Sequence, residues 1–188
     1  MQKDLHIVGF AGSLRKGSYN RRLLDIVSDL LPAGTTYETI ELNDIPLFNE
    51  DVEKDGFPQS VIDFRKAIQN ADALLIASPE YNSSITGVLK NALDWASRSE
   101  NKQPSPLNHK PVAILGAGGR GGTDRSQYHL RSVLSHLNMH LVNKPEVLIN
   151  MPGRQVFDEE GNLLDEFAVK LMRQLLQNLV DHTYQLSK

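Results

Sequence analysis

A short segment near the N-terminus combines the residue types that bind a phosphate group. It runs from Phe10 to Asn20 and contains Gly12, two serines and an arginine. Ser13 and Ser18 supply hydroxyl groups, and Arg15 supplies a guanidinium that can make charge-assisted hydrogen bonds to an anion. A strand-like apolar run precedes the segment and an amphipathic run follows it, so we expect a loop that leads into a helix N-terminus, where an anion is favoured. A tight solvent loop without a ligand is the alternative, because Gly, Ser and Asn are common turn residues.

Two further loops of unusual composition follow apolar runs. The segment Ser78 to Ser84 reads S-P-E-Y-N-S-S, and Gly116 to Gly122 reads G-A-G-G-R-G-G. If the apolar runs are parallel strands, the carboxyl ends of these strands meet at one edge of the sheet, where ligands bind in such folds. The sequence therefore predicts that the three loops form one site.

Other phosphate-handling classes fit this sequence less well. Gly12 to Ser18 has the glycine spacing of a nucleotide P-loop, but Ser18 stands where that motif requires lysine. A phosphatase of this architecture needs a cysteine nucleophile in the first loop, and the chain has no cysteine. A phospho-accepting receiver domain needs an aspartate at the end of the third strand, where this chain has Ser78.

The third loop formally matches the dinucleotide fingerprint. Gly116, Gly118 and Gly121 have the G-x-G-x-x-G spacing, but they follow the fourth predicted strand rather than the first. No acidic residue for a ribose stands at the end of the next strand. We interpret these glycines instead as positions where the backbone approaches a flat ligand.

Metal and thiol chemistry have little support in the sequence. Without cysteine there is no disulfide, thiol nucleophile, cysteine-ligated zinc or iron–sulfur cluster. His136 and His140 have a spacing found in metal ligands, but Asn138 is expected to end the helix between them, and no third ligand is evident. We predict no metal site.

Several residues that attract attention have ordinary structural interpretations. We expect Glu80 to cap a backbone group rather than act as an acid or base, and Trp95 to pack in the core. Tyr81 could lie by a ligand or at a subunit interface, and Arg120 could contact a nucleotide phosphate or be solvated. The acidic stretch Glu50 to Asp55 is expected to be a solvated rim.

Hydrophobic periodicity predicts an α/β protein with a doubly wound, five-stranded parallel sheet and helices on both faces. Continuous apolar runs indicate strands buried on both faces. The predicted strands cover 5–11, 36–42, 73–77, 111–115 and part of 139–149, and the predicted helices cover 22–31, 61–71, 85–96, 128–137 and 164–179. Residues 43–56 are expected to form a loop. No linker divides the sequence, so residues 1–188 are expected to form a single domain.

Composition narrows the classes of partner. The formal net charge of −3 argues against general binding to nucleic acid. No apolar run approaches membrane-spanning length, and Met1 to Asp4 lead directly into the first strand without a signal peptide. We therefore expect a cytoplasmic protein that binds neither nucleic acid nor membranes.

The three loops together resemble the NADPH-dependent FMN reductase family, and the nearest branch is the bacterial quinone and chromate reductases. The resemblance rests on G-S-L-R-x-x-S-x-N at 12–20, S-P-E-Y-N at 78–82 and G-x-L-K-N-A-L-D-W at 87–95. The acidic segment P-L-F-N-E-D at 46–51 is also similar to that branch. The resemblance implies a flavodoxin-like fold that binds FMN and takes hydride from NADPH or NADH.

The resemblance also implies roles for individual residues. The FMN phosphate would be held by Ser13, Arg15, Ser18 and Asn20. The isoalloxazine would be lined, largely through backbone groups, by Pro79, Glu80, Tyr81, Asn82 and Ser83. Its pyrimidine edge would be bordered by Gly116, Ala117, Gly118 and Gly119. Relatives often carry a serine in this last loop, so the chain departs from the family pattern there.

The chemistry implied needs no protein nucleophile, which agrees with the absence of a Ser-His-Asp or Cys-His arrangement. We expect a two-electron reduction of small acceptors, with quinones as the main class and chromate, azo compounds and free flavin as others. The resemblance implies a homodimer or homotetramer, in which the helix after Asn82 helps to form the interface and the partner completes the flavin site. The alternatives are a non-enzymatic flavodoxin-type electron shuttle and a nucleotide-binding regulatory module.

Overall fold

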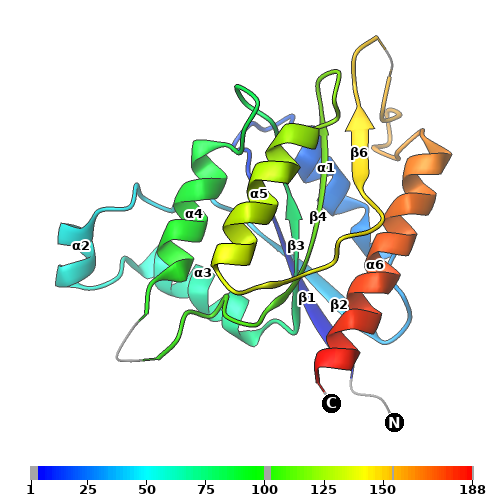
Figure 1. Cartoon of the computed structure of the whole chain (residues 1–188). Coiled ribbons are helices and arrows are strands. Elements are labelled where there is room, and N and C mark those ends of the chain that lie inside the picture. Colours follow the sequence, from blue (N-terminus) through cyan, green and yellow to red (C-terminus); the bar gives the residue numbers. More distant parts are fainter. Residues whose placement is uncertain (1–3, 100–102, 154, 188) are drawn as a thin grey trace.

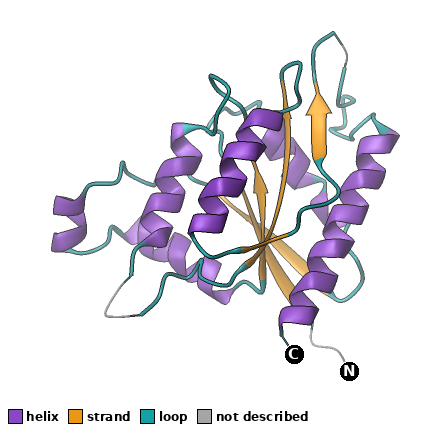
Figure 2. Cartoon of the chain, viewed as in Figure 1, coloured by secondary structure: helices purple, strands orange, loops and turns teal. Residues whose placement is uncertain are grey.

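The computed structural model describes residues 4–99, 103–153 and 155–187, and its centre is a parallel β-sheet with helices on both faces (Figures 1 and 2). The strands are β1 (Leu5–Ala11), β2 (Thr35–Ile40), β3 (Ala73–Ala77), β4 (Pro111–Gly118), β5 (His140–Leu141) and β6 (Val147–Asn150). They lie in the order β2-β1-β3-β4-β5, and β6 also pairs with β4. All of these pairs are parallel. The predicted α/β class and doubly wound sheet are confirmed.

The fifth position of the sheet is shared by two short strands. Pro111 of β4 is in register with His140 of β5, whereas Leu115 is in register with Val147 of β6. Pro145, which follows a cis peptide bond, lies between the two strands. Pairing with β4 ends at Val142 and resumes at Val147, and Pro145, which has no N–H to donate to a ladder, lies within this interruption.

The helices are α1 (Tyr19–Asp25), α2 (Glu50–Asp55), α3 (Gln59–Asn70), α4 (Gly87–Ser97), α5 (Asp124–His136) and α6 (Glu166–Leu186), with a 3₁₀ turn at Val27–Asp29. Several predicted bounds were wrong in detail: α5 starts at residue 124 rather than 128, α6 runs to residue 186 rather than 179, and β2 ends at residue 40 rather than 42. The first helix starts at residue 19 because Ser18 caps it, and the chain tightens into the 3₁₀ turn before residue 31. Residues 43–56 are not all loop, since the side chain of Asn49 accepts from the N–H of Asp51 and starts α2.

The pleat of each central strand divides the core between the two faces of the sheet. Leu75 and Leu115 face α1 and α6, whereas Ile76 and Ile114 face α3, α4 and α5. Strand β3 is buried throughout, as its unbroken apolar sequence predicts, and β2 is an edge strand with alternating exposure. Buried helices on both faces hold the strand ends, and hence the loops, in fixed positions.

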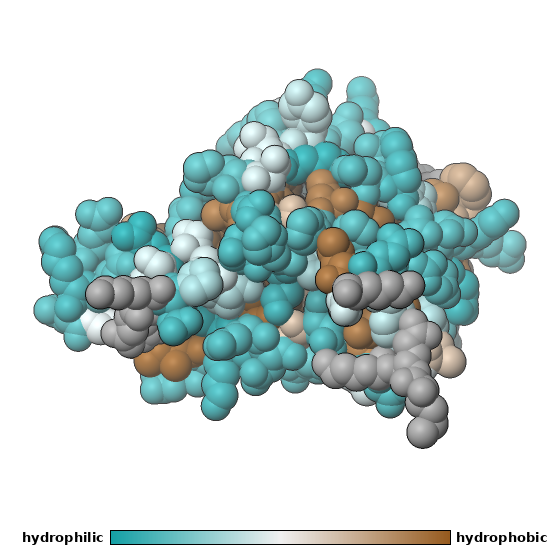
Figure 3. Space-filling model, turned by 60° about the horizontal axis from the view of Figure 1, so that its bottom comes forward, coloured by the Kyte–Doolittle hydropathy of each residue, from teal (hydrophilic) through white to brown (hydrophobic). Residues whose placement is uncertain are grey.

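The loops that follow β1, β3 and β4 lie together at the top of Figure 1, at the carboxyl edge of the sheet, while both chain ends lie at the bottom. Figure 3 views the molecule from that bottom end, which is mainly hydrophilic with small separate hydrophobic areas. Among the helices of the described residues, none is both long and apolar enough to cross a membrane.

Candidate functional site

The first loop presents two buried hydroxyls and one exposed guanidinium. Ser13 and Ser18 are 7% and 3% exposed, and Ser18 Oγ accepts from the N–H of Arg21 at 3.4 Å, which caps α1. The N–H of Ser18 donates to the carbonyl of Arg15 at 2.9 Å and closes the loop. Within the described residues Arg15 makes no ion pair, so its charge is available to an anion. Since α1 is short, the hydroxyls and Arg15 contribute more to such a site than the helix dipole does.

Asn20 joins the first loop to the third. Its Nδ2 donates to the carbonyl of Ala117 at 2.8 Å, and its Oδ1 accepts from the N–H of Ala117 at 3.0 Å. The side chain is 4% exposed, so this paired contact is made away from water. The amide oxygen of Asn20 and one of its amide hydrogens are therefore both used in hydrogen bonds to β4. Asn20 thus connects the end of the first loop to the strand from which the third loop begins. Direct contact with a phosphate remains a prediction.

The second loop contains a tight turn. Tyr81 and Ser84 exchange backbone hydrogen bonds of 3.1 and 3.0 Å, and the two central residues have positive φ angles of 50° at Asn82 and 60° at Ser83. A two-residue turn with both central residues in the left-handed region matches the twist of a hairpin, and Asn is suited to it. The turn leaves the Tyr81 side chain 56% exposed above the sheet edge.

Glu80 acts as a cap, as predicted. Its Oε2 accepts from the backbone N–H of Ser126 at 3.1 Å, in the first turn of α5. The Ser126 hydroxyl donates to the carbonyl of Pro79 at 2.7 Å, and Arg125 Nη1 donates to Ser83 Oγ at 2.8 Å. These contacts fix the second loop on α5 and give the Glu80 carboxylate a structural role.

The third loop is shorter than predicted, because Gly116, Ala117 and Gly118 belong to β4 and pair with β6. A Cβ on Gly116 would lie 2.2 Å from Thr123 Oγ1 and 2.5 Å from the Ser78 carbonyl oxygen. Packing within the protein therefore requires this glycine, and the interpretation that it admits a ligand is unnecessary. Gly119 differs, since nothing lies within 4 Å of its added Cβ and the space beside it is open. Two of the three glycines of the G-x-G-x-x-G match, Gly116 and Gly118, lie inside β4 rather than in the turn before α5, which counts against the dinucleotide fingerprint.

Sequence reasoning missed two buried hydroxyl residues that assemble the site. Thr86 Oγ1 donates to the carbonyl of Gly12 at 2.6 Å and accepts from the N–H of Leu89, so it caps α4 and ties it to the first loop. Ser126 joins the second loop to α5. Thr86 directly precedes α4, and a threonine at a helix start is an N-cap signal, but the predicted helix began one residue earlier, at 85, and therefore included it. Nothing in the sequence pairs Ser126 with residues almost fifty positions earlier.

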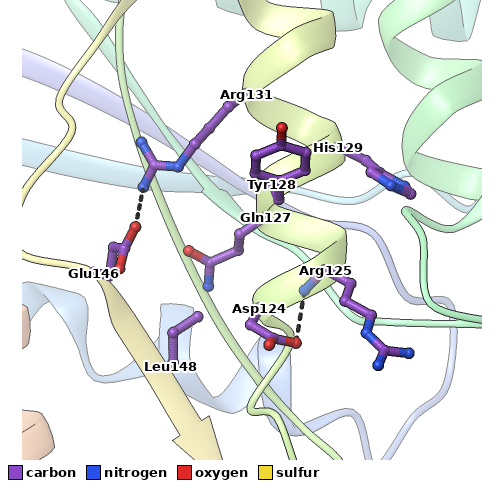
Figure 4. Close-up of a pocket in the computed structure, with 8 residues that line it drawn as sticks. All are labelled: Asp124, Arg125, Gln127, Tyr128, His129, Arg131, Glu146 and Leu148. Carbon is purple, nitrogen blue, oxygen red and sulfur yellow. Dashed lines mark hydrogen bonds and ion pairs between the residues drawn. The ribbon is translucent and has the colours of Figure 1, made fainter.

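A hollow of about 360 Å³ lies behind the third loop, between α5 and β6 (Figure 4). Arg131 crosses it to Glu146 at 3.7 Å, while Arg125 points to the other side of the helix. Gln127 is 2% exposed, and its Oε1 has no hydrogen-bond partner among the residues that the structure describes. The hollow is lined by Leu148 and exposed Tyr128 but by none of the predicted site residues.

The histidines at 136 and 140 are separated as expected. Helix α5 ends at His136, and Asn138 takes a φ of 56° that turns the chain. His140 lies in β5, and its Nε2 is 3.2 Å from Nδ1 of His109. Trp95 is fully buried, which confirms the core interpretation.

The arrangement suits a ligand with one phosphate and a flat ring, such as FMN. The first loop offers buried hydroxyls and the exposed guanidinium of Arg15, and Gly119 borders open space at the same sheet edge. The fold is that of a flavodoxin-like protein, a class in which ligands bind at the carboxyl edge of the sheet.

Comparisons with known proteins identify the family. The sequence profile of NADPH-dependent FMN reductases matches residues 5–152. An NAD(P)H-dependent FMN reductase of Pseudomonas aeruginosa is 51% identical over 180 residues, covering 95% of each chain, and an NADPH:quinone oxidoreductase of Arabidopsis thaliana is 43% identical over 97% of this chain and 93% of its own. The solved structure of FerB, a flavoenzyme NAD(P)H:(acceptor) oxidoreductase from Paracoccus denitrificans, superposes with a TM-score of 0.85 at 29% identity, covering 96% of this chain and 98% of its own.

The chain belongs to the NADPH-dependent FMN reductase family. It is an oxidoreductase whose cofactor is FMN and whose electron donor is NAD(P)H.

Proposed function

We propose that this enzyme reduces quinones by two electrons at the carboxyl edge of its sheet, with NADPH or NADH as donor. The observation that carries the proposal is the first loop, whose buried serine hydroxyls and exposed Arg15, which has no carboxylate partner among the described residues, suit a phosphomonoester. The whole-length similarity to relatives named as quinone oxidoreductases supports quinones as the acceptor class.

The proposal gives the residues of the three loops the roles predicted from the sequence. Residues 13–20 hold the phosphate, 79–83 line the ring and 116–119 border its pyrimidine edge. When bound, FMN supplies the redox chemistry, accepting hydride from the nicotinamide and delivering two electrons to the acceptor. The chain itself binds and orients the partners, and its Glu80 is engaged as a cap rather than as an acid or base.

Chromate, azo compounds and free flavin are further acceptors that we propose. Tyr81 is half exposed and Gly119 adjoins open space, so the edge is not enclosed by this chain alone. An open site selects acceptors weakly by shape, and their reduction potentials then decide which are reduced.

We also propose that residues 1–188 act as one domain in the cytoplasm and form a homodimer or homotetramer. Exposed aromatic side chains near the site, 56% at Tyr81 and 74% at Tyr128, support burial by a second copy. Both core clusters flank one sheet, which supports a single unit.

The test combines cofactor identification with anaerobic turnover. Denaturing the purified protein should release FMN, identified by mass, and NADPH with a benzoquinone should give hydroquinone in equal amounts without a radical product by electron paramagnetic resonance. An electron shuttle would contain FMN but fail to oxidise NADPH. A regulatory module would release ATP or GTP instead.

A further inference from the structure

Four side chains from two distant segments form a continuous stack beside the first loop. The rings of Tyr19 and Phe157 are parallel within 14°, with centroids 5.9 Å apart. The guanidinium carbon of Arg15 lies 5.4 Å from the centre of the Tyr19 ring, and that of Arg22 lies 5.7 Å from the centre of the Phe157 ring. The stack joins the first loop to the chain between β6 and α6.

The far end of this stack is firmly held. Phe157 is 4% exposed and belongs to the core cluster under α1 and α6. It forms an antiparallel bridge with Leu163, and the N–H of Leu164 donates to the carbonyl of Val156 at 2.9 Å. The Tyr19 ring therefore rests on a fixed surface rather than on a mobile one.

The other end of the stack is Arg15, the cation of the proposed phosphate site. Arg15 is exposed, and within the described residues it has no carboxylate partner. Its Nη1 would lie 3.4 Å from a Cβ on Gly17, so the guanidinium folds over its own loop. A long side chain held in one orientation loses less conformational entropy when it binds a ligand.

We propose that Tyr19 is a positioning residue for the FMN phosphate, acting by holding Arg15 over the loop. The inference rests on the proposed phosphate location and is independent of the acceptor. We attribute the positioning of Arg15 to the aromatic ring of Tyr19, because the Tyr19 hydroxyl has no hydrogen-bond partner among the described residues.

The test is titration of the apoprotein with FMN and with riboflavin, which lacks the phosphate, followed by flavin fluorescence. Since an exposed cation–π contact is worth about 0.5–1 kcal/mol, Tyr19→Leu should weaken FMN binding by about twofold to fivefold. Riboflavin binding should not change. Tyr19→Phe should match the wild type, and Phe167→Leu, which removes an exposed aromatic ring on α6, is the matched control.

Combining substitutions separates this inference from the phosphate location. In the Arg15→Ala background, Tyr19→Leu should cause no further loss, because the two residues act as one unit. Loss of FMN binding in Arg15→Ala but not in Tyr19→Leu would overturn the inference alone. Unchanged FMN binding in Arg15→Ala would overturn the phosphate location and the inference together. Equal weakening of FMN and riboflavin in Tyr19→Leu would also overturn it, since it would show general loop packing.

Discussion

At the scale of single residues, buried polar side chains fix the shape of the site. Asn20 hydrogen-bonds to both the N–H and the carbonyl of Ala117. Thr86 donates to the Gly12 carbonyl, and Ser126 donates to the Pro79 carbonyl. Breaking such a bond leaves a buried group unsatisfied, which costs about 1–3 kcal/mol. The three loops are therefore held together by the protein itself, which reduces the ordering that a cofactor must impose on binding.

Substitutions in the first loop should release the cofactor. Arg15→Ala should weaken FMN binding by about tenfold or more, because a charge-assisted hydrogen bond contributes about 1.5–3 kcal/mol. Ser18→Ala should weaken it too and also lower the free energy of unfolding by about 1 kcal/mol, since Ser18 caps α1. Fluorescence titration measures the first effect and urea denaturation the second. Wild-type FMN affinity in both variants would contradict the phosphate location.

Gly116, in β4, and Gly119, just after it, should differ sharply in how well they tolerate substitution by alanine. Gly116→Ala should destabilise the protein by about 1–3 kcal/mol, because its Cβ meets the Ser78 backbone and Thr123. Gly119→Ala should change stability by less than about 0.5 kcal/mol, since its added Cβ meets open space. Urea denaturation of both apoproteins compares them directly. Equal stabilities would show that β4 can shift away from Thr123.

Substitutions of Glu80 distinguish a structural role of its carboxylate from an acid–base role in catalysis. Glu80→Ala should cost about 1 kcal/mol of stability through loss of the cap on the Ser126 N–H, while Glu80→Gln keeps an acceptor and should cost less. Neither substitution should lower the rate of flavin reduction by NADPH by more than about threefold, which corresponds to about 0.65 kcal/mol of activation free energy. A hundredfold slower reduction in Glu80→Gln with intact stability would instead assign it an acid–base role.

At the scale of elements, the arm from residue 43 to residue 58 stands away from the sheet, with α2 at the left of Figure 1. Side chains of α4 hold it: Asn91 accepts from the N–H of Phe48 and donates to the carbonyl of Pro46, and the buried Trp95 makes further contacts. Trp95 Nε1 donates to the carbonyl of Pro46 at 2.8 Å, and the Trp95 ring meets Phe48 and Phe57 edge-on, with centroids 4.9 and 5.8 Å away. The arm therefore depends on α4 although it forms no part of the sheet.

Trp95→Phe should loosen this arm. We expect a loss of about 1–3 kcal/mol from the missing hydrogen bond and reduced ring contact, with faster cleavage by a glutamate-specific protease near Glu50. Arg98→Ala removes the part-exposed ion pair with Glu53 and the contact of the guanidinium with the Phe48 ring, but no buried hydrogen bond, and should cost about 1 kcal/mol or less. Denaturation and limited proteolysis of the two variants make the comparison. Equal protection of the arm in Trp95→Phe would show that Trp95 does not anchor it.

The elements that the sequence predicts well are those with unbroken or periodic apolar residues. Strand β3 and helix α3 follow such patterns and were located to within two residues, whereas α6 was predicted to end at residue 179 and runs to Leu186. The strand break at Pro145 and the extension of β4 through Gly118 depend on pairing between distant segments, which a local pattern does not contain. For the site, residue types identified the loops, but the contacts of Asn20 and Ser126 arise only once the sheet is assembled.

At the scale of the whole molecule, the sheet brings three loops from separate parts of the chain to one edge. The hollow beside α5 and the exposed Tyr128 lie outside these loops, on a surface available to a second copy. Tyr128→Glu should therefore shift the oligomer toward smaller species in analytical ultracentrifugation while FMN stays bound. An unchanged sedimentation coefficient would place the interface elsewhere.

The central claim is that FMN held at this edge passes electrons from NAD(P)H to a quinone. Anaerobic rapid mixing of the purified holoenzyme with NADPH or NADH tests it most directly, with the visible absorption of the flavin as the signal. We predict that the absorption is lost on mixing and restored by one equivalent of a benzoquinone. A flavin that stays oxidised with both donors, or one that the quinone fails to reoxidise, would contradict the account.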